Sequence, residues 1–125
     1  MKFRKLPILI SVLLLCTACA TTSIDTRIQV LDSFWGTDVH ITNVASFINS
    51  SDLLEVQITG VNEESDYLKL EYRIEWLDNN GFLIPSKLTQ WTEFPAFEKT
   101  DFRVKMIAPK TNATDFKILI REVNN

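Results

Sequence analysis

The residues of this sequence with the greatest capacity for chemistry are one histidine and two cysteines. His40 follows Asp38 by two residues, and on a strand this spacing puts both side chains on one face. An imidazole beside a carboxylate can serve as a general base, but hydrolysis also needs a nucleophile, and the sequence contains no Gly-x-Ser-x-Gly elbow. We therefore expect His40 to be a surface histidine or one satisfied by hydrogen bonds, and we predict no catalytic residue.

Both cysteines stand at the end of a segment that has the parts of an export signal. Residues 1–5 carry three basic side chains, and residues 6–15 are apolar apart from Ser11. As a helix, that apolar run would cover about 15 Å, roughly half of the hydrocarbon core of a bilayer. The run is therefore predicted to be the core of a signal peptide and not a permanent membrane span.

The motif Cys16-Thr17-Ala18-Cys19 resembles the lipobox of bacterial lipoproteins, in which small side chains precede a cysteine that receives diacylglycerol. The sequence departs from that pattern at Cys16, where leucine is usual. We predict cleavage before Cys19 and lipidation of its thiol; the alternative is an ordinary secretory signal that is cut after Ala18 or Ala20 and releases a soluble protein. Because Ala20 and not Asp follows the cysteine, the motif resembles lipoproteins sorted to the outer membrane, and we expect a lipid-anchored envelope protein that faces the periplasm.

Removal of residues 1–18 changes the charge of the chain. Three of the 13 basic residues and none of the 16 acidic residues precede the cleavage point, so the mature chain carries 10 − 16 = −6 charges. This balance argues against nucleic acid as a partner and against electrostatic adhesion to anionic lipid. Since Cys16 leaves with the signal and Cys19 carries lipid, the mature chain has no disulfide and no thiolate, and we expect neither a metal site nor a cofactor.

Alternating apolar and polar residues dominate the rest of the chain. The pattern runs without a break over residues 68–76 and recurs over 54–59, 102–106 and 116–121, with weaker strand candidates at 28–31 and 39–44. Such alternation is typical of antiparallel sheet with one face on a core. The sequence therefore predicts an all-β sandwich of two antiparallel sheets over residues 27–125, joined to the membrane by a lipidated tether at residues 19–26.

Turn residues fall between the predicted strands. Asp78-Asn79-Asn80-Gly81 directly follows the longest alternating run and predicts a tight hairpin into residues 82–84. The same residues lack the alternating oxygen ligands and the closing glutamate of a calcium loop. Pro85 is expected to mark a strand end or a sheet edge.

A resemblance to a known family rests on residues spread over most of the mature chain. The chain is similar to the YcfL-like family of predicted bacterial lipoproteins at Leu53-Leu54-Glu55-Val56-Gln57 with Asn62, at Tyr72-Arg73-Ile74-Glu75-Trp76-Leu77-Asp78 with Gly81, at Trp91, and at Ala108-Pro109 with Asp115-Phe116-Lys117. The resemblance implies a small immunoglobulin-like sandwich in the envelope of Gram-negative bacteria and brings no catalytic residues. It also points to the peptidoglycan synthesis machinery as a place to look for a partner.

Aromatic residues supply the remaining candidates for binding. Trp76 has the parity of the core face, and we expect it to pack there. Phe34, Trp35, Phe47 and Ile48 fall where the strand pattern is faint; on the surface they would be candidate partner contacts, and the alternative is that they cap an open end of the sandwich. The sequence thus predicts a non-enzymatic module that binds an envelope protein. Alternatives are an accessory binder of peptidoglycan or a small glycan and, more remotely, a hydrolase.

Overall fold

The computed structural model describes residues 27–30, 36–87 and 89–123. In this part of the chain the backbone forms strands and no helix. In chain order the strands are β1 (Ile28–Val30), β2 (Val39–Ile48), β3 (Leu54–Asn62), β4 (Leu68–Leu77), β5 (Thr92–Ala96), β6 (Thr100–Ile107) and β7 (Asp115–Glu122).

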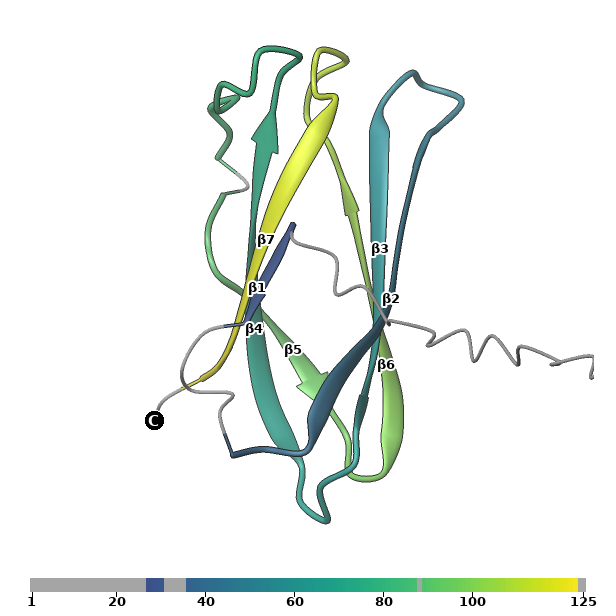
Figure 1. Ribbon diagram of the computed structural model, residues 1–125, viewed down its shortest axis with the longest axis vertical. Helices are drawn as coiled ribbons and strands as arrows, with labels where there is room; N and C mark the ends of the chain where they lie inside the picture. Colours follow the sequence, from purple (N-terminus) through teal and green to yellow (C-terminus); the bar gives the residue numbers. More distant parts are fainter. Residues whose placement is uncertain (1–26, 31–35, 88, 124–125) are drawn as a thin grey trace, which may run out of the picture.

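The strands of the described residues form two sheets that face one another (Figure 1). One sheet has the order β1-β7-β4-β5 and the other the order β2-β3-β6. All pairings are antiparallel except that of β1 with β7, which is parallel. The predicted all-β, immunoglobulin-like sandwich is therefore confirmed as an architecture, with one parallel pair added at the edge of the larger sheet.

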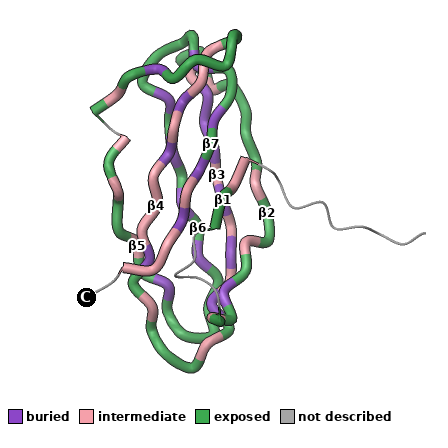
Figure 2. The backbone as a smooth tube through the Cα atoms, turned by 60° about the vertical axis from the view of Figure 1, so that its left-hand side comes forward, coloured by how far each residue is buried: buried purple, intermediate pink, exposed green. Residues whose placement is uncertain are grey.

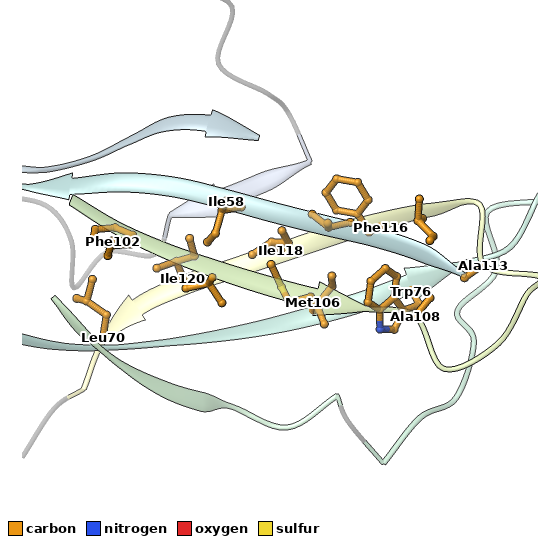
Figure 3. Packing of buried hydrophobic residues seen from close by; sticks show 14 of the residues in the cluster. Ile58, Leu70, Trp76, Phe102, Met106, Ala108, Ala113, Phe116, Ile118 and Ile120 are labelled. Atoms are coloured by element: carbon orange, nitrogen blue, oxygen red, sulfur yellow. The ribbon is translucent and has the colours of Figure 1, made fainter. Parts of the chain in front are cut away.

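The core lies between the two sheets and consists of the inward-pointing residues, which alternate with outward-pointing residues along the strands. Figure 3 shows Ile58 and Met106 of the smaller sheet facing Ile118 and Ile120 of the larger one, and Figure 2 shows the buried positions following the strands. Trp76 is 1 % exposed and packs in this core, as its parity predicted. Burying an aromatic ring of this size contributes ~1.5–3 kcal/mol to stability, so the core can hold the sandwich without a cross-link.

The structure differs from the sequence prediction between β4 and β5. The turn at Asp78 and Gly81 forms as expected, and Gly81 adopts a φ of 81° that a side chain would oppose. After the turn, however, only an isolated bridge joins Leu77 to Leu83, and the partner of β4 on this side is β5. The alternation gave no sign of β5, a five-residue strand that contains Pro95.

One extra residue interrupts the pairing of β2 with β3. The register shifts between Ile41 and Asn43, and Thr42 is the residue left over. Its hydroxyl donates to the carbonyl of Thr59 at 3.1 Å, which satisfies the strand at this point. Because a bulge exchanges the two faces of a strand, even-numbered residues of β2 point outward before Thr42 and odd-numbered residues point outward after it.

A buried asparagine ties together the loops at one end of the sandwich. Asn62 is fully buried at the end of β3, and its side-chain amide donates to the carbonyl oxygens of Asp66 at 3.0 Å and Ala96 at 2.9 Å. Its own side-chain oxygen accepts from the backbone nitrogen of Glu64 at 2.9 Å. One side chain thus links the β3–β4 connection to the turn between β5 and β6.

We predict that Asn62→Ala lowers the free energy of unfolding by about 2–3 kcal/mol, because it leaves buried backbone groups without partners. Urea unfolding monitored by circular dichroism measures this change. The matched control is Asn112→Ala in an exposed loop, which should alter stability by no more than about 0.5 kcal/mol. Equal effects of the two substitutions would contradict the role given to Asn62.

Candidate functional site

Three large apolar side chains lie exposed together at one end of the smaller sheet. Phe47 and Ile48 are the last two residues of β2 and are each 57 % exposed. Ile107 is the last residue of β6 and is 42 % exposed. Phe47 and Ile107 are both paired with Glu55 of β3, so Phe47, Glu55 and Ile107 form one row across the outer face. Ile48 points to the other face, next to Leu54. We call Phe47, Ile48 and Ile107 the apolar patch.

A carboxylate lies in the middle of the apolar patch. Glu55 is 8 % exposed, and the side chains of Phe47 and Ile107 on either side of it have no hydrogen-bond donor for its carboxylate. Its Oε1 accepts from the side-chain amide of Asn49 at 3.0 Å, and its Oε2 lies 3.4 Å from Nζ of Lys105. Because the charge is paired inside the molecule, the patch can be covered by a partner without stranding a buried carboxylate.

Phe47 and Ile48, which the sequence singled out, are exposed, and the structure shows other exposed apolar residues that the sequence analysis missed. Ile107 ends an alternating strand, and Phe82 and Leu83, which are 69 % and 52 % exposed, had been assigned to a hairpin strand. They lie in the connection between β4 and β5, at the end of the sandwich that also holds the β2–β3 hairpin (Figure 1). At the opposite end, Tyr67 and Phe97 are exposed with ring centroids 5.5 Å apart.

The structure also assembles the groups around the single histidine. His40 Nε2 lies 2.6 Å from Oδ1 of Asp38, as expected for residues on one face, and 3.7 Å from Oε2 of Glu63. Glu63 follows β3 directly, and the pairing of Val39 with Asn62 brings it to this place. All three side chains are more than half exposed and stand on an open surface, so the geometry offers no enclosed site for hydrolysis.

The remaining aromatic and charged residues singled out in the sequence serve the sandwich itself. Glu71 forms an ion pair with Arg121, and the Arg121 guanidinium lies 3.8 Å from the centroid of Trp91, so these three side chains stack on one another. Lys69 pairs with Glu93 on the neighbouring strand at 3.9 Å. Lys69 and Glu71 of β4 are thus cross-strand partners.

Three of the residues singled out in the sequence, Cys19, Phe34 and Trp35, lie outside the described residues. The expected lipidation site and two of the four candidate partner contacts are therefore not described, and the proposed roles of all these residues remain predictions from the sequence. Within the part of the chain that the structure describes, no helix has the length and hydropathy needed to cross a bilayer.

The fold and the apolar patch define a class: a small β-sandwich of immunoglobulin-like architecture that presents a hydrophobic surface at one end. A family model described as "Protein of unknown function (DUF1425)" matches residues 26–122, and the chain belongs to this family. The YcfL-like resemblance is compatible with this family. Among curated proteins, no match was found.

Two solved structures have the same fold. The crystal structure of Campylobacter jejuni cj0090 superposes with a TM-score of 0.67 at 18 % identity, covering 79 % of this chain and 100 % of that one. A DUF1425 family member from Shewanella sp. pv-4 superposes with a TM-score of 0.63 at 20 % identity, covering 71 % of this chain and 82 % of that one. At these identities the likeness supports the fold alone.

We predict that Phe47→Ser and Ile48→Ser each change the free energy of unfolding by less than about 1 kcal/mol, because most of each side chain is already in water. Phe116→Ala, at a site that is 1 % exposed, should instead cost about 3–5 kcal/mol. Urea unfolding of the three variants provides the comparison. A loss at Phe47 as large as that at Phe116 would mean that the patch serves folding and not binding.

Proposed function

We propose that this chain is a non-enzymatic, lipid-anchored protein of the bacterial envelope that faces the periplasm and docks another envelope protein through the apolar patch. The observation that carries the docking proposal is the exposure of Phe47 and Ile107 on either side of a carboxylate that is already paired, with Ile48 also exposed at the end of β2. Side chains of this kind cost solubility in a free protein and are enriched at the centres of protein interfaces.

The shape of the surface favours a protein partner over a glycan. Phe47 and Ile107 project from the outer face of a sheet, and Ala45 of the next row adds a further small apolar side chain on β2. Sugar-binding sites usually combine an aromatic platform with several convergent polar groups, whereas the polar group at the centre of this patch is already paired with Asn49 and Lys105. A complementary apolar surface on a protein fits these residues better.

The free edge of β2 extends the same surface. Among the described strands, β2 pairs with β3 alone, so the backbone groups along its other side are available to an added strand. Strand addition provides backbone hydrogen bonds, and side-chain pockets beside the edge provide selectivity. Phe47 and Ile48, at the end of this edge, are suited to that second role.

The proposed anchor rests on charge as well as on the lipobox. A mature chain with a net charge of −6 is repelled by the anionic surface of a membrane, so residence there needs a lipid. Two acyl chains are enough for stable anchoring, whereas a single chain gives marginal binding. Diacylglycerol on Cys19 would meet this requirement.

We predict that Cys19→Ala abolishes incorporation of labelled palmitate and leaves an unprocessed precursor, because the thiol is the acceptor of the lipid. Metabolic labelling followed by electrophoresis measures both effects. Cys16→Ala, three residues upstream, is the matched control and should still be labelled. Normal processing and labelling of the Cys19 variant would exclude the proposed anchor.

Docking at the apolar patch predicts a position-specific crosslink in living cells. A photoreactive phenylalanine analogue at position 47 should give a discrete adduct with one envelope protein, whereas the same analogue at position 97 should not. Phe97 is a matched control because it is 56 % exposed and lies at the opposite end of the sandwich. The position-47 adduct should weaken when Ile107 is changed to Ser in the same chain.

Two outcomes would overturn the docking proposal. One is equal crosslinking at positions 47 and 97, which would mean that the adducts reflect random encounters. The other is crosslinking of position 47 to purified peptidoglycan fragments with no adduct to a protein, which would make the chain a cell-wall binder. Because the resemblance points to peptidoglycan synthesis, the enzymes of that process are the first candidates when the adduct is identified.

A further inference from the structure

We infer that Asp38, His40 and Glu63 form a binding site for a divalent first-row transition metal ion, of which Zn²⁺ is the natural probe. One ligand atom from each residue can be chosen so that all three atoms lie within 4.8 Å of one another. His40 Nε2 is 2.6 Å from Asp38 Oδ1 and 3.7 Å from Glu63 Oε2. This site lies ~23 Å along β2 from the apolar patch, at ~3.3 Å per residue, and does not depend on the proposed docking function.

The geometry of the three side chains needs little adjustment. Bonds of ~2.0–2.1 Å to a tetrahedral ion place neighbouring ligand atoms about 3.3 Å apart. The observed separations fall on either side of that value, one shorter and one longer. The two distances from His40 Nε2 differ from that value by about 0.7 and 0.4 Å, and because all three side chains are more than half exposed, their ligand atoms can shift by such amounts without disturbing the core.

The types of ligand atom select the class of ion. An imidazole nitrogen with two carboxylate oxygens suits Zn²⁺, Ni²⁺ or Cu²⁺, whereas Ca²⁺ and Mg²⁺ prefer oxygen ligands alone. The neutral imidazole offers a lone pair at Nε2 when its proton is on Nδ1. In that tautomer, a bond from Nε2 to the metal replaces the hydrogen bond between Nε2 and Oδ1 of Asp38. Three protein ligands leave at least one position for water or for a ligand from another molecule.

The backbone that carries the three ligands is fixed by hydrogen bonds outside the cluster of side chains. The backbone nitrogen of Glu63 donates to the carbonyl of Asp38 at 2.8 Å, and the backbone nitrogen of Asp38 donates to Oε1 of Glu64 at 2.7 Å. Between the ligands, Val39 and Asn62 are buried and paired with one another. Ligands held by packed strands lose less conformational freedom on binding than ligands on free loops.

The ammonium group of Lys99, next to the proposed site, contacts a backbone carbonyl oxygen and not the two carboxylates. Lys99 donates from Nζ to the carbonyl oxygen of Glu63, and its own backbone nitrogen donates to the carbonyl of Glu64 at 3.2 Å. Neither carboxylate of the proposed site has an ion pair with Lys99 in the described structure. The carboxylates of Asp38 and Glu63 both lie beside His40, and a divalent ion would balance their negative charges.

The test uses the full chain purified in detergent, with Cys16 and Cys19 both changed to Ser and without a polyhistidine tag, so that no thiolate or added histidine competes. Titration calorimetry with Zn²⁺ should show one site, and Zn²⁺ should raise the melting temperature, because an ion that binds the folded state stabilises it. Cu²⁺ should give an electron paramagnetic resonance spectrum with coupling to the nitrogen of one imidazole. Ca²⁺ should neither bind comparably nor displace Zn²⁺.

Variants assign the site to its residues. His40→Ala and Glu63→Gln should each weaken Zn²⁺ binding by more than about tenfold, since loss of a direct ligand exceeds the usual effect of losing a group behind one. Asp52→Asn changes an exposed acidic residue at the far end of the same strand pair and should leave the affinity unchanged. Absence of Zn²⁺ binding, equal affinity in His40→Ala, or equal binding of Ca²⁺ would overturn the inference and leave a simple histidine–carboxylate pair.

Discussion

The pairing of β2 with β3 is the interaction on which both surface features of this molecule depend. At one end of the pair, the alignment of Val39 with Asn62 brings Glu63 beside His40. At the other end, the alignment of Phe47 with Glu55 puts an exposed ring next to a paired carboxylate. The single extra residue at Thr42 reconciles the two, because without it His40 and Phe47 could not both point to the outer face.

The backbones of the strand pair approach closely for a reason that lies in the core. A side chain at Gly60 would come within 2.4 Å of the ring of Phe102 and 2.7 Å of the carbonyl oxygen of His40, so glycine alone leaves room for both. Phe102 in turn contacts Phe94 of the other sheet, with ring centroids 5.3 Å apart. Gly60 thus lets β2 at His40 and the aromatic contact between Phe102 and β5 lie on either side of the same point of β3.

The sequence predicted the parts of the fold in which alternation is unbroken and missed those in which it is interrupted. Residues 68–76 alternate without exception, and β4 covers them as Leu68–Leu77. The bulge at Thr42 hides the second half of β2, because the apolar residues change parity there. Pro95 concealed β5, and Glu63, which lies 23 positions from His40 in the chain, could not be linked to it by any local pattern. Alternation shows which residues of a strand share a face. It does not show how neighbouring strands are aligned, and that alignment decides which residues of different strands lie close together.

Pro95 has a consequence for self-assembly. It is opposite Lys69 of β4, whose carbonyl accepts from the backbone nitrogen of Val123, directly after β7. Lys69 therefore directs its backbone groups away from β5, and the imino nitrogen of Pro95 faces outward. The outer border of the four-stranded sheet thus lacks a donor at its centre, and the described strand at the opposite border has only three residues. Copies of this protein at high local concentration are consequently hindered from pairing edge to edge through that sheet to form a continuous fibril.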